Sequence, residues 1–281
     1  MNIVSVQVYS DPNTPWNRSR IDFPISVEKT IWPGNGCGLC NQIFKLMNTI
    51  AFNQGRDIYV DLFSIDYIDG HTVCVSDILD LEQMRKNGLR IYDIIELDYR
   101  QPYLIRTYPA VYSLYHMNRS LFTSIAKSLR FTTRYEKIAK TVILNKGLLN
   151  KIVNLVHLRI DLDYKNLVVA TSGPEKYSNL IEKYRSLIYS NFDKSIPLVL
   201  LLEETTHEFV KELQKDYEVY MFEKSDVLSI DPSICGREIF ALIDMLSAKE
   251  LNVDNFIGFY GSTFSLILNN IINTKKSIII E

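Results

Sequence analysis

Strand-like and helix-like segments alternate along the second half of the chain, and this alternation restricts the fold more than any other feature. The apolar run Pro197–Leu202 (PLVLLL) stands between two helix-like segments, Tyr177–Asn191 and Thr206–Lys215. Such alternation is typical of α/β domains, in which helices connect parallel strands. We therefore expect a doubly wound α/β domain, whose ligands bind beyond the carboxyl ends of the strands.

The same pattern continues on both sides of this run. Helix Thr206–Lys215 has Thr205 or Thr206 as its expected cap. The other predicted strands are Leu155–Arg159, Tyr217–Phe222, Asn255–Phe259 and Ser277–Ile280, and the other predicted helices are Gly236–Lys249 and Phe264–Asn273. Parallel strands bring their carboxyl ends to one edge of a sheet, so the residues that follow them are candidates for a site.

The first half of the chain is less regular and contains several prolines and glycines. Its predicted elements are strand Asn2–Tyr9, a glycine turn at Gly34–Gly38, helix Asn41–Asn53, strand Asp57–Phe63 and helix Asp77–Asn87, which Gly88 ends. We interpret residues 1–145 and 146–281 as two Rossmann-like domains that face each other across a cleft.

Composition and charge exclude several classes of protein. The 31 basic and 33 acidic residues leave a net charge of −2, so nucleic-acid binding lacks the basic surface it needs. No basic segment typical of a signal peptide begins the chain. The uncharged stretch Asn255–Thr274 holds four asparagines and two glycines, which disfavour a membrane span and predict a loop. We expect a soluble, cytoplasmic protein.

A glycine turn opens the first predicted helix, in the segment GCGLCNQIF at 36–44. Glycines such as Gly38 let backbone amides approach a ligand closely, and a helix N-terminus favours negative charge. Asn41 either caps this helix or points toward a sugar or phosphate. Cys37 and Cys40 form a C-x-x-C pair, but a zinc site needs two further ligands and the other cysteines are single and distant.

Polar residues end the predicted strand in the segment VHLRIDLDY at 156–164. His157 and Arg159 are two residues apart, so they project to the same side of a strand. The guanidinium of Arg159 offers a fixed fork of donors that matches a diphosphate. Two alternatives stay open, an ion pair of Arg159 with Asp161 or Asp163, and a structural role for His157 in the core.

The segment FIGFYGSTFS at 256–265 has the pattern of a strand, a Gly-Ser-Thr turn and a helix start. Helix N-terminal amides, with the hydroxyls of Ser262 and Thr263, form a phosphate cradle beside Gly261. The segment lacks the lysine of a Walker loop, and it is not the G-x-S-x-G turn of a serine nucleophile. The alternative is that Ser262 or Thr263 only caps the last helix.

In this order, the three segments resemble the fucosyltransferase superfamily with the GT-B fold. GLCNQIF at 38–44 is similar to the G-[LF]-G-N-Q start of those enzymes, and HLRIDLDYKN at 157–166 is similar to the H-L-R-x-x-x-D segment of protein O-fucosyltransferases. FIGFYGSTFS resembles the C-terminal segment that holds the donor diphosphate. The preceding helix, with Asp244, resembles the one whose acidic residue lies near the nucleotide.

This resemblance implies an inverting glycosyltransferase that uses no metal or other cofactor. It would move a sugar from a nucleotide-sugar donor, bound by 146–281, to a glycan or protein acceptor on the side of 1–145. Arg159 and the Gly261–Ser265 amides would hold the departing diphosphate, and Asn41 and His157 would orient the substrates. The implied donor-binding residues are Gly38, Asn41, His157, Arg159, Asp244, Gly261, Ser262, Thr263 and Phe264.

The general base is the assignment that the sequence leaves most open. Asp163, Asp161 and Asp11 are candidates, and we place Asp163 in the catalytic set with Arg159, Asn41 and His157. Asp161-Leu162-Asp163 matches the D-x-D of metal-dependent enzymes by spelling. In the family comparison, however, it follows the arginine strand, so we expect no metal.

Two positions depart from the family pattern. The bacterial α1,2- and α1,6-type enzymes carry two adjacent arginines, whereas Ile160 stands at the second place here, and Cys40 replaces a glycine. Both changes leave room for another donor, such as UDP-xylose instead of GDP-fucose. The short chain fits a bacterial or viral type of enzyme. The alternatives are a nucleotide-sugar-binding module without transferase activity and a thiol redox protein that uses Cys37 and Cys40.

Overall fold

The computed structural model describes residues 29–32, 38–52, 55–66, 71–97, 104–105, 115–116, 118–203 and 205–281. The predicted strand Asn2–Tyr9, Asp11 and Cys37 lie outside these residues. The chain divides into two compact units, Met1–Thr133 with Gly236–Ile239, and Arg134–Cys235 with Phe240–Glu281. The predicted ranges, 1–145 and 146–281, place helix α6 (Thr133–Asn145) in the first domain, whereas all but its first residue belongs to the second unit.

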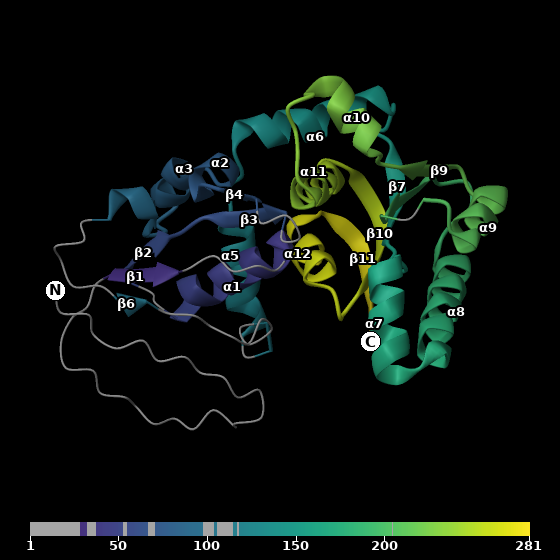
Figure 1. The fold of residues 1–281 in the computed structure, drawn as a ribbon. Helices are drawn as coiled ribbons and strands as arrows, with labels where there is room; N and C mark the ends of the chain where they lie inside the picture. Colours follow the sequence, from purple (N-terminus) through teal and green to yellow (C-terminus); the bar gives the residue numbers. More distant parts are fainter. Residues whose placement is uncertain are drawn as a thin grey trace. The chain divides into compact units, whose positions relative to one another are not determined.

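The first unit contains a parallel sheet in the order β5-β2-β1-β6 (Figure 1). Its strands are β1 (Lys29–Trp32), β2 (Asp57–Val60), β5 (Ile91–Asp93) and β6 (Leu104–Ile105). Strands β3 (Phe63–Asp66) and β4 (His71–Val73) form a separate antiparallel pair. The single predicted strand over Asp57–Phe63 is therefore wrong. It breaks after Val60, where the Asp61 carboxylate accepts a hydrogen bond from Leu62 N at 2.8 Å.

The described helices of the first unit include one long helix, α1, which packs beside the antiparallel pair. Its side chain Gln42 exchanges two hydrogen bonds with the backbone of Ser64, at 2.8 and 2.9 Å. These helices are α1 (Leu39–Phe52), α2 (Val75–Ile78), α3 (Leu81–Lys86), the 3-10 turn η1 (Ile94–Glu96) and α5 (Arg119–Ser128). The predicted single helix Asp77–Asn87 is wrong, because Asp80 interrupts it and caps α3 by accepting from Gln83 N.

The second unit contains a five-stranded parallel sheet in the order β11-β10-β7-β8-β9. Its strands are β7 (Ile152–His157), β8 (Leu198–Leu201), β9 (Val219–Met221), β10 (Asn252–Phe259) and β11 (Thr274–Ile280). The first strand of the unit, β7, lies in the centre, and the chain builds outward on one side and then on the other. This is the strand order of the Rossmann fold, as predicted.

Helices cover both faces of this sheet, with α8 and α9 on one face and α11 and α12 on the other (Figure 1). In addition to α6, the described helices of the unit are α7 (Leu162–Ser172), α8 (Pro174–Asn191), α9 (Glu208–Asp216), α10 (Lys224–Ile230), α11 (Arg237–Lys249) and α12 (Thr263–Ile271). The first turn of α11 belongs to the first unit. The cap of α9 is His207, whose Nδ1 accepts from Phe209 N, and not Thr205 or Thr206 as predicted. Helix α7 was not predicted.

The uncharged stretch Asn255–Thr274 contains the end of β10, a turn and α12, so the predicted loop within it is confirmed. Among the described helices, none combines the length and the apolar character that crossing a membrane requires.

Candidate functional site

Two adjacent strands of the second unit, β7 and β10, define where a ligand is expected to bind. They pair in parallel. The chain continues from β7 to β8 on one side of the pair and from β10 to β11 on the other side, so the gap beyond the carboxyl ends of β7 and β10 is the topological switch point. Ligands of open α/β sheets bind in this place. Arg159 follows β7, and Gly261 follows β10, so the second and third sequence segments meet at this edge of the sheet.

Arg159 lies two residues beyond the end of β7, and not on the strand as predicted, because β7 ends at His157. Its guanidinium donates to the Asp161 carboxylate at 2.8 Å and lies over the ring of Tyr164. The ion pair that the sequence left as an alternative is therefore present. About a third of the side chain remains exposed, so the guanidinium is both held in place and accessible to a ligand.

His157 is buried at the end of β7, and its Nδ1 lies 2.6 Å from Ser265 Oγ. Its ring packs against that of Phe264, with 4.6 Å between the centroids and the planes tilted by 34°. Burial, assisted by the nearby charge of Arg159, lowers the pKa of His157 to about 3. The imidazole is therefore neutral at physiological pH, which suits a structural contact or a hydrogen bond to a ligand but not an ionic contact.

The Gly-Ser-Thr turn joins β10 to α12, and Ser262 N closes it by donating to Phe259 O at 3.1 Å. Ser262 occupies the N-cap position, yet its side chain makes no capping hydrogen bond, which removes it from the capping alternative. Gly261 is exposed, and a Cβ there would lie 2.6 Å from the Phe259 ring. The backbone at Gly261 is therefore exposed, whereas Ser262 and Thr263 are buried, and the helix N-terminus behind the turn favours an anion.

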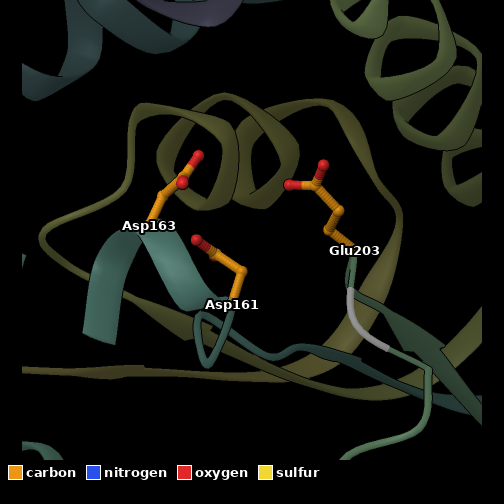
Figure 2. A group of neighbouring side chains, drawn as sticks. All are labelled: Asp161, Asp163 and Glu203. Atoms are coloured by element: carbon orange, nitrogen blue, oxygen red, sulfur yellow. The ribbon is translucent and has the colours of Figure 1, made fainter. Parts of the chain in front are cut away.

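Three carboxylates gather at the same edge of the sheet, on Asp161, Asp163 and Glu203 (Figure 2). Their oxygens lie within 4.8 Å of one another, so they can hold a cation or accept a proton. Asp161 already uses both oxygens, since Oδ1 accepts from Tyr164 N and Oδ2 accepts from Arg159. The exposed pair Asp163 and Glu203 therefore carries the accessible negative charge of this group.

Glu203 is the residue of this group that the sequence analysis missed. It follows β8, the neighbour of β7 in the sheet, just as Arg159 follows β7. The signal was available, because an acidic residue directly after the apolar run PLVLLL must lie at the carboxyl edge of a buried parallel strand.

Asp244 lies on α11, in the second unit. Burial, with a smaller effect of the Asp226 charge, raises the pKa of Asp244 well above its ordinary value. Burial thus makes this carboxyl group harder to ionise than an exposed one. Its predicted role beside the nucleotide base stays a prediction.

Gly38 and Asn41 belong to the first unit, at the start of α1. The helix begins at Leu39, so Asn41 lies inside its first turn and does not cap it. The carboxylate of Glu238, which is buried, accepts a hydrogen bond from Leu39 N at 2.6 Å. A Cβ on Gly38 would lie 3.2 Å from that carboxylate, so this glycine gives the Glu238 side chain room. An anion of the protein itself therefore occupies the start of α1.

No protein-family model matches the chain, and no curated protein matches its sequence. Its fold is similar to solved structures. Against POFUT1 in its apo form, the TM-score is 0.58 at 15% identity over 91% of this chain and 99% of that one. Against POFUT1 in complex with GDP-fucose, it is 0.57 at 13% identity, over 90% and 98%. Against the fucosyltransferase NodZ from Bradyrhizobium, it is 0.50 at 12% identity, over 88% and 94%.

The parallel sheets and their strand order place this chain in the class of Rossmann-like α/β folds. Within that class, the chain has the GT-B fold of the fucosyltransferases. The fold predicted from the resemblance of the three segments is therefore confirmed.

Proposed function

We propose that this protein is a glycosyltransferase that moves a sugar from a nucleotide-sugar donor to an acceptor hydroxyl, with GDP-fucose as the first candidate donor. The observation that carries the proposal is the position of Arg159 and of the Gly261–Ser265 turn on either side of one switch point. The fold supports it, since POFUT1, which shares this fold, forms a complex with GDP-fucose. UDP-xylose remains the second candidate donor, because Ile160 replaces an arginine of the family pattern.

In the proposed reaction, the bond between the sugar and the diphosphate breaks, and the acceptor oxygen bonds to the sugar with inversion. Negative charge then grows on the departing diphosphate. Arg159 would balance that charge through two parallel hydrogen bonds. The amides of the Gly261–Ser265 turn, apart from that of Ser262, which donates to Phe259 O, would add dipoles that are already oriented. Such fixed groups lower the barrier because they need no rearrangement as the charge develops.

The acceptor hydroxyl loses a proton in this reaction. Asp163 and Glu203 are the candidates to receive it, since both are exposed carboxylates in one group with Asp161, which is buried. We assign the role to Asp163, with Glu203 as its neighbour. Holding donor and acceptor in one geometry would supply the remainder of the rate increase, and we assign Asn41 and His157 to that task.

Thermal unfolding with a panel of nucleotides tests the donor. GDP, UDP, CDP and their sugars would be added separately, because a ligand that binds only the folded state raises its melting temperature. We expect GDP and GDP-fucose to give the largest shifts. The best donor would then be incubated with glycan and peptide acceptors while nucleotide release is followed. Binding without release in the presence of acceptors would favour a nucleotide-sugar-binding module instead.

A further inference from the structure

Tyr184, on α8, is a fully buried side chain whose hydroxyl contacts the backbone at the end of β7. The hydroxyl donates to the carbonyl of His157 at 2.9 Å and accepts from the amide of Arg159 at 3.3 Å. One phenol thus bridges the last residue of the strand and Arg159, which follows the strand at the switch point. The strand ends at the residue whose carbonyl accepts from this side chain.

A second buried tyrosine supports the same loop. Tyr177 lies seven residues earlier on α8, which places it two turns away on the same face of the helix. Its hydroxyl donates to the carbonyl of Ile160 at 2.6 Å. The two phenols together therefore contact three of the four residues from His157 to Ile160, through the backbone alone.

Packing alone does not explain these hydroxyls. A phenylalanine would fill nearly the same volume, and burying a hydroxyl is costly unless it forms hydrogen bonds. Burial also raises the pKa of Tyr184, so the phenol stays protonated and can donate and accept at once. The hydroxyl of Tyr184 is therefore best explained by its two hydrogen bonds to the backbone of His157 and Arg159.

We propose that Tyr184 is a positioning residue, whose hydroxyl fixes the backbone from which Arg159 projects and so aligns the guanidinium with the departing diphosphate. Asp161 and Tyr164 hold the far end of the Arg159 side chain, and Tyr184 holds its base. The inference rests on the proposed function, in which Arg159 contacts the donor. Small displacements of a charge-stabilising group reduce turnover strongly, because its geometry is matched to the transition state.

The test replaces each of two tyrosines on α8 by phenylalanine. Tyr184→Phe removes the hydroxyl at the loop, and Tyr189→Phe is the matched control, since its hydroxyl donates to Asp216 at the surface. With the best donor, we expect Tyr184→Phe to lower kcat about tenfold or more, with a smaller change in donor KM. Tyr189→Phe should leave both unchanged. Equal kinetics of the two variants would overturn the proposal.

A double-mutant cycle separates positioning from general destabilisation. Binding of GDP would be measured for the wild type, Tyr184→Phe, Arg159→Ala and the double variant. If the hydroxyl acts through Arg159, its removal weakens GDP binding in the wild-type background and has no further effect in the Arg159→Ala background. The same loss in both backgrounds would overturn the proposal. If Tyr184→Phe does not fold, Tyr177→Phe takes its place with the same two outcomes.

Amide hydrogen exchange gives a readout that does not depend on activity. We expect the Arg159 amide to exchange about tenfold faster in Tyr184→Phe and at the wild-type rate in Tyr189→Phe. Unchanged exchange in Tyr184→Phe would overturn the positioning role even in an active enzyme. If the wild type neither binds nucleotide nor transfers sugar, the proposed function fails, while exchange still reports whether the hydroxyl holds the loop.

Discussion

His157 Nδ1 and Ser265 Oγ lie 2.6 Å apart and join the end of β7 to the first turns of α12. Ser265 Oγ also accepts from Phe259 N, at the end of β10, at 2.9 Å. One hydroxyl therefore ties together the three elements that border the switch point. The contact also means that His157 contributes to the core whether or not it contacts a ligand.

The buried imidazole predicts a pH dependence of stability. The pKa of His157 is about 3 in the folded state and 6.5 when unfolded, so only the unfolded chain gains a proton between these values. The contribution of His157 is complete above pH 6.5 and is lost as the pH falls toward 3. The slope is at most about 1.4 kcal/mol per pH unit.

Urea unfolding at pH 7, 6 and 5 checks this prediction on the wild type, His157→Gln and Ser265→Ala. The free energy of unfolding should fall less steeply in His157→Gln, which does not titrate. Ser265→Ala keeps the buried imidazole and should keep most of the wild-type slope. Parallel curves for the wild type and His157→Gln would contradict the assignment.

Arg159→Ala should reduce transfer by at least about a hundredfold and leave the fold intact, because the charge on the departing diphosphate then lacks its partner. Arg159→Lys should not restore the rate, since an ammonium group does not reproduce the paired hydrogen bonds of a guanidinium. Arg134→Ala is the control, because Arg134 pairs with Asp231 in the same unit. Steady-state kinetics and urea unfolding check both parts. A kcat near that of the wild type in Arg159→Ala would show that the donor binds elsewhere.

Gly261→Ala should weaken nucleotide binding. The new methyl group would lie 2.6 Å from the Phe259 ring, which packs edge-on against Tyr164 and cannot move without disturbing it. We expect a loss of about tenfold in GDP affinity, measured by calorimetry, which corresponds to ~1.4 kcal/mol. The double variant Gly261→Ala with Phe259→Leu should regain part of the affinity, because the obstructing ring is gone. No regain would mean that another contact of the turn is responsible.

Transfer should proceed without a divalent cation, because Arg159 and the turn amides would carry the diphosphate charge. EDTA should therefore change the rate by less than about twofold. Asp163→Asn should lower kcat through the loss of a base, and added Mn²⁺ should not alter that loss. A strict requirement for Mn²⁺ that disappears in both Asp163→Asn and Glu203→Gln would instead assign the carboxylates to a metal.

Short-range patterns predicted the elements around which the second unit is built. The run PLVLLL and the segment before the Gly-Ser-Thr turn are strands because apolar residues are bounded by turn residues, and both predictions are confirmed. A local pattern also marks the break within the predicted helix Asp77–Asn87. Asp80 and Gln83 have the spacing of a helix cap, and the break between α2 and α3 falls there.

Contacts between distant residues account for most of what the sequence did not reveal. At the end of β7, the carbonyl of His157 accepts from Tyr184, which is 27 residues away in the sequence. Glu203 joins Asp161 and Asp163 because β8 pairs beside β7. No local pattern encodes such pairings. The residue types of the site could therefore be predicted from the sequence, whereas the distant residues that contact them could not.

The hydrogen bond from Leu39 N to Glu238 spans 199 residues, and this separation has a consequence for biosynthesis. The start of α1 obtains its carboxylate only after most of the chain has been made. At about 5–20 residues per second, a ribosome needs roughly 10–40 s to cover that interval. During this time the first unit lacks the segment Gly236–Ile239 that belongs to it. An N-terminal fragment ending near residue 133 is therefore an incomplete folding unit, and it should be less stable than the same residues in the whole chain.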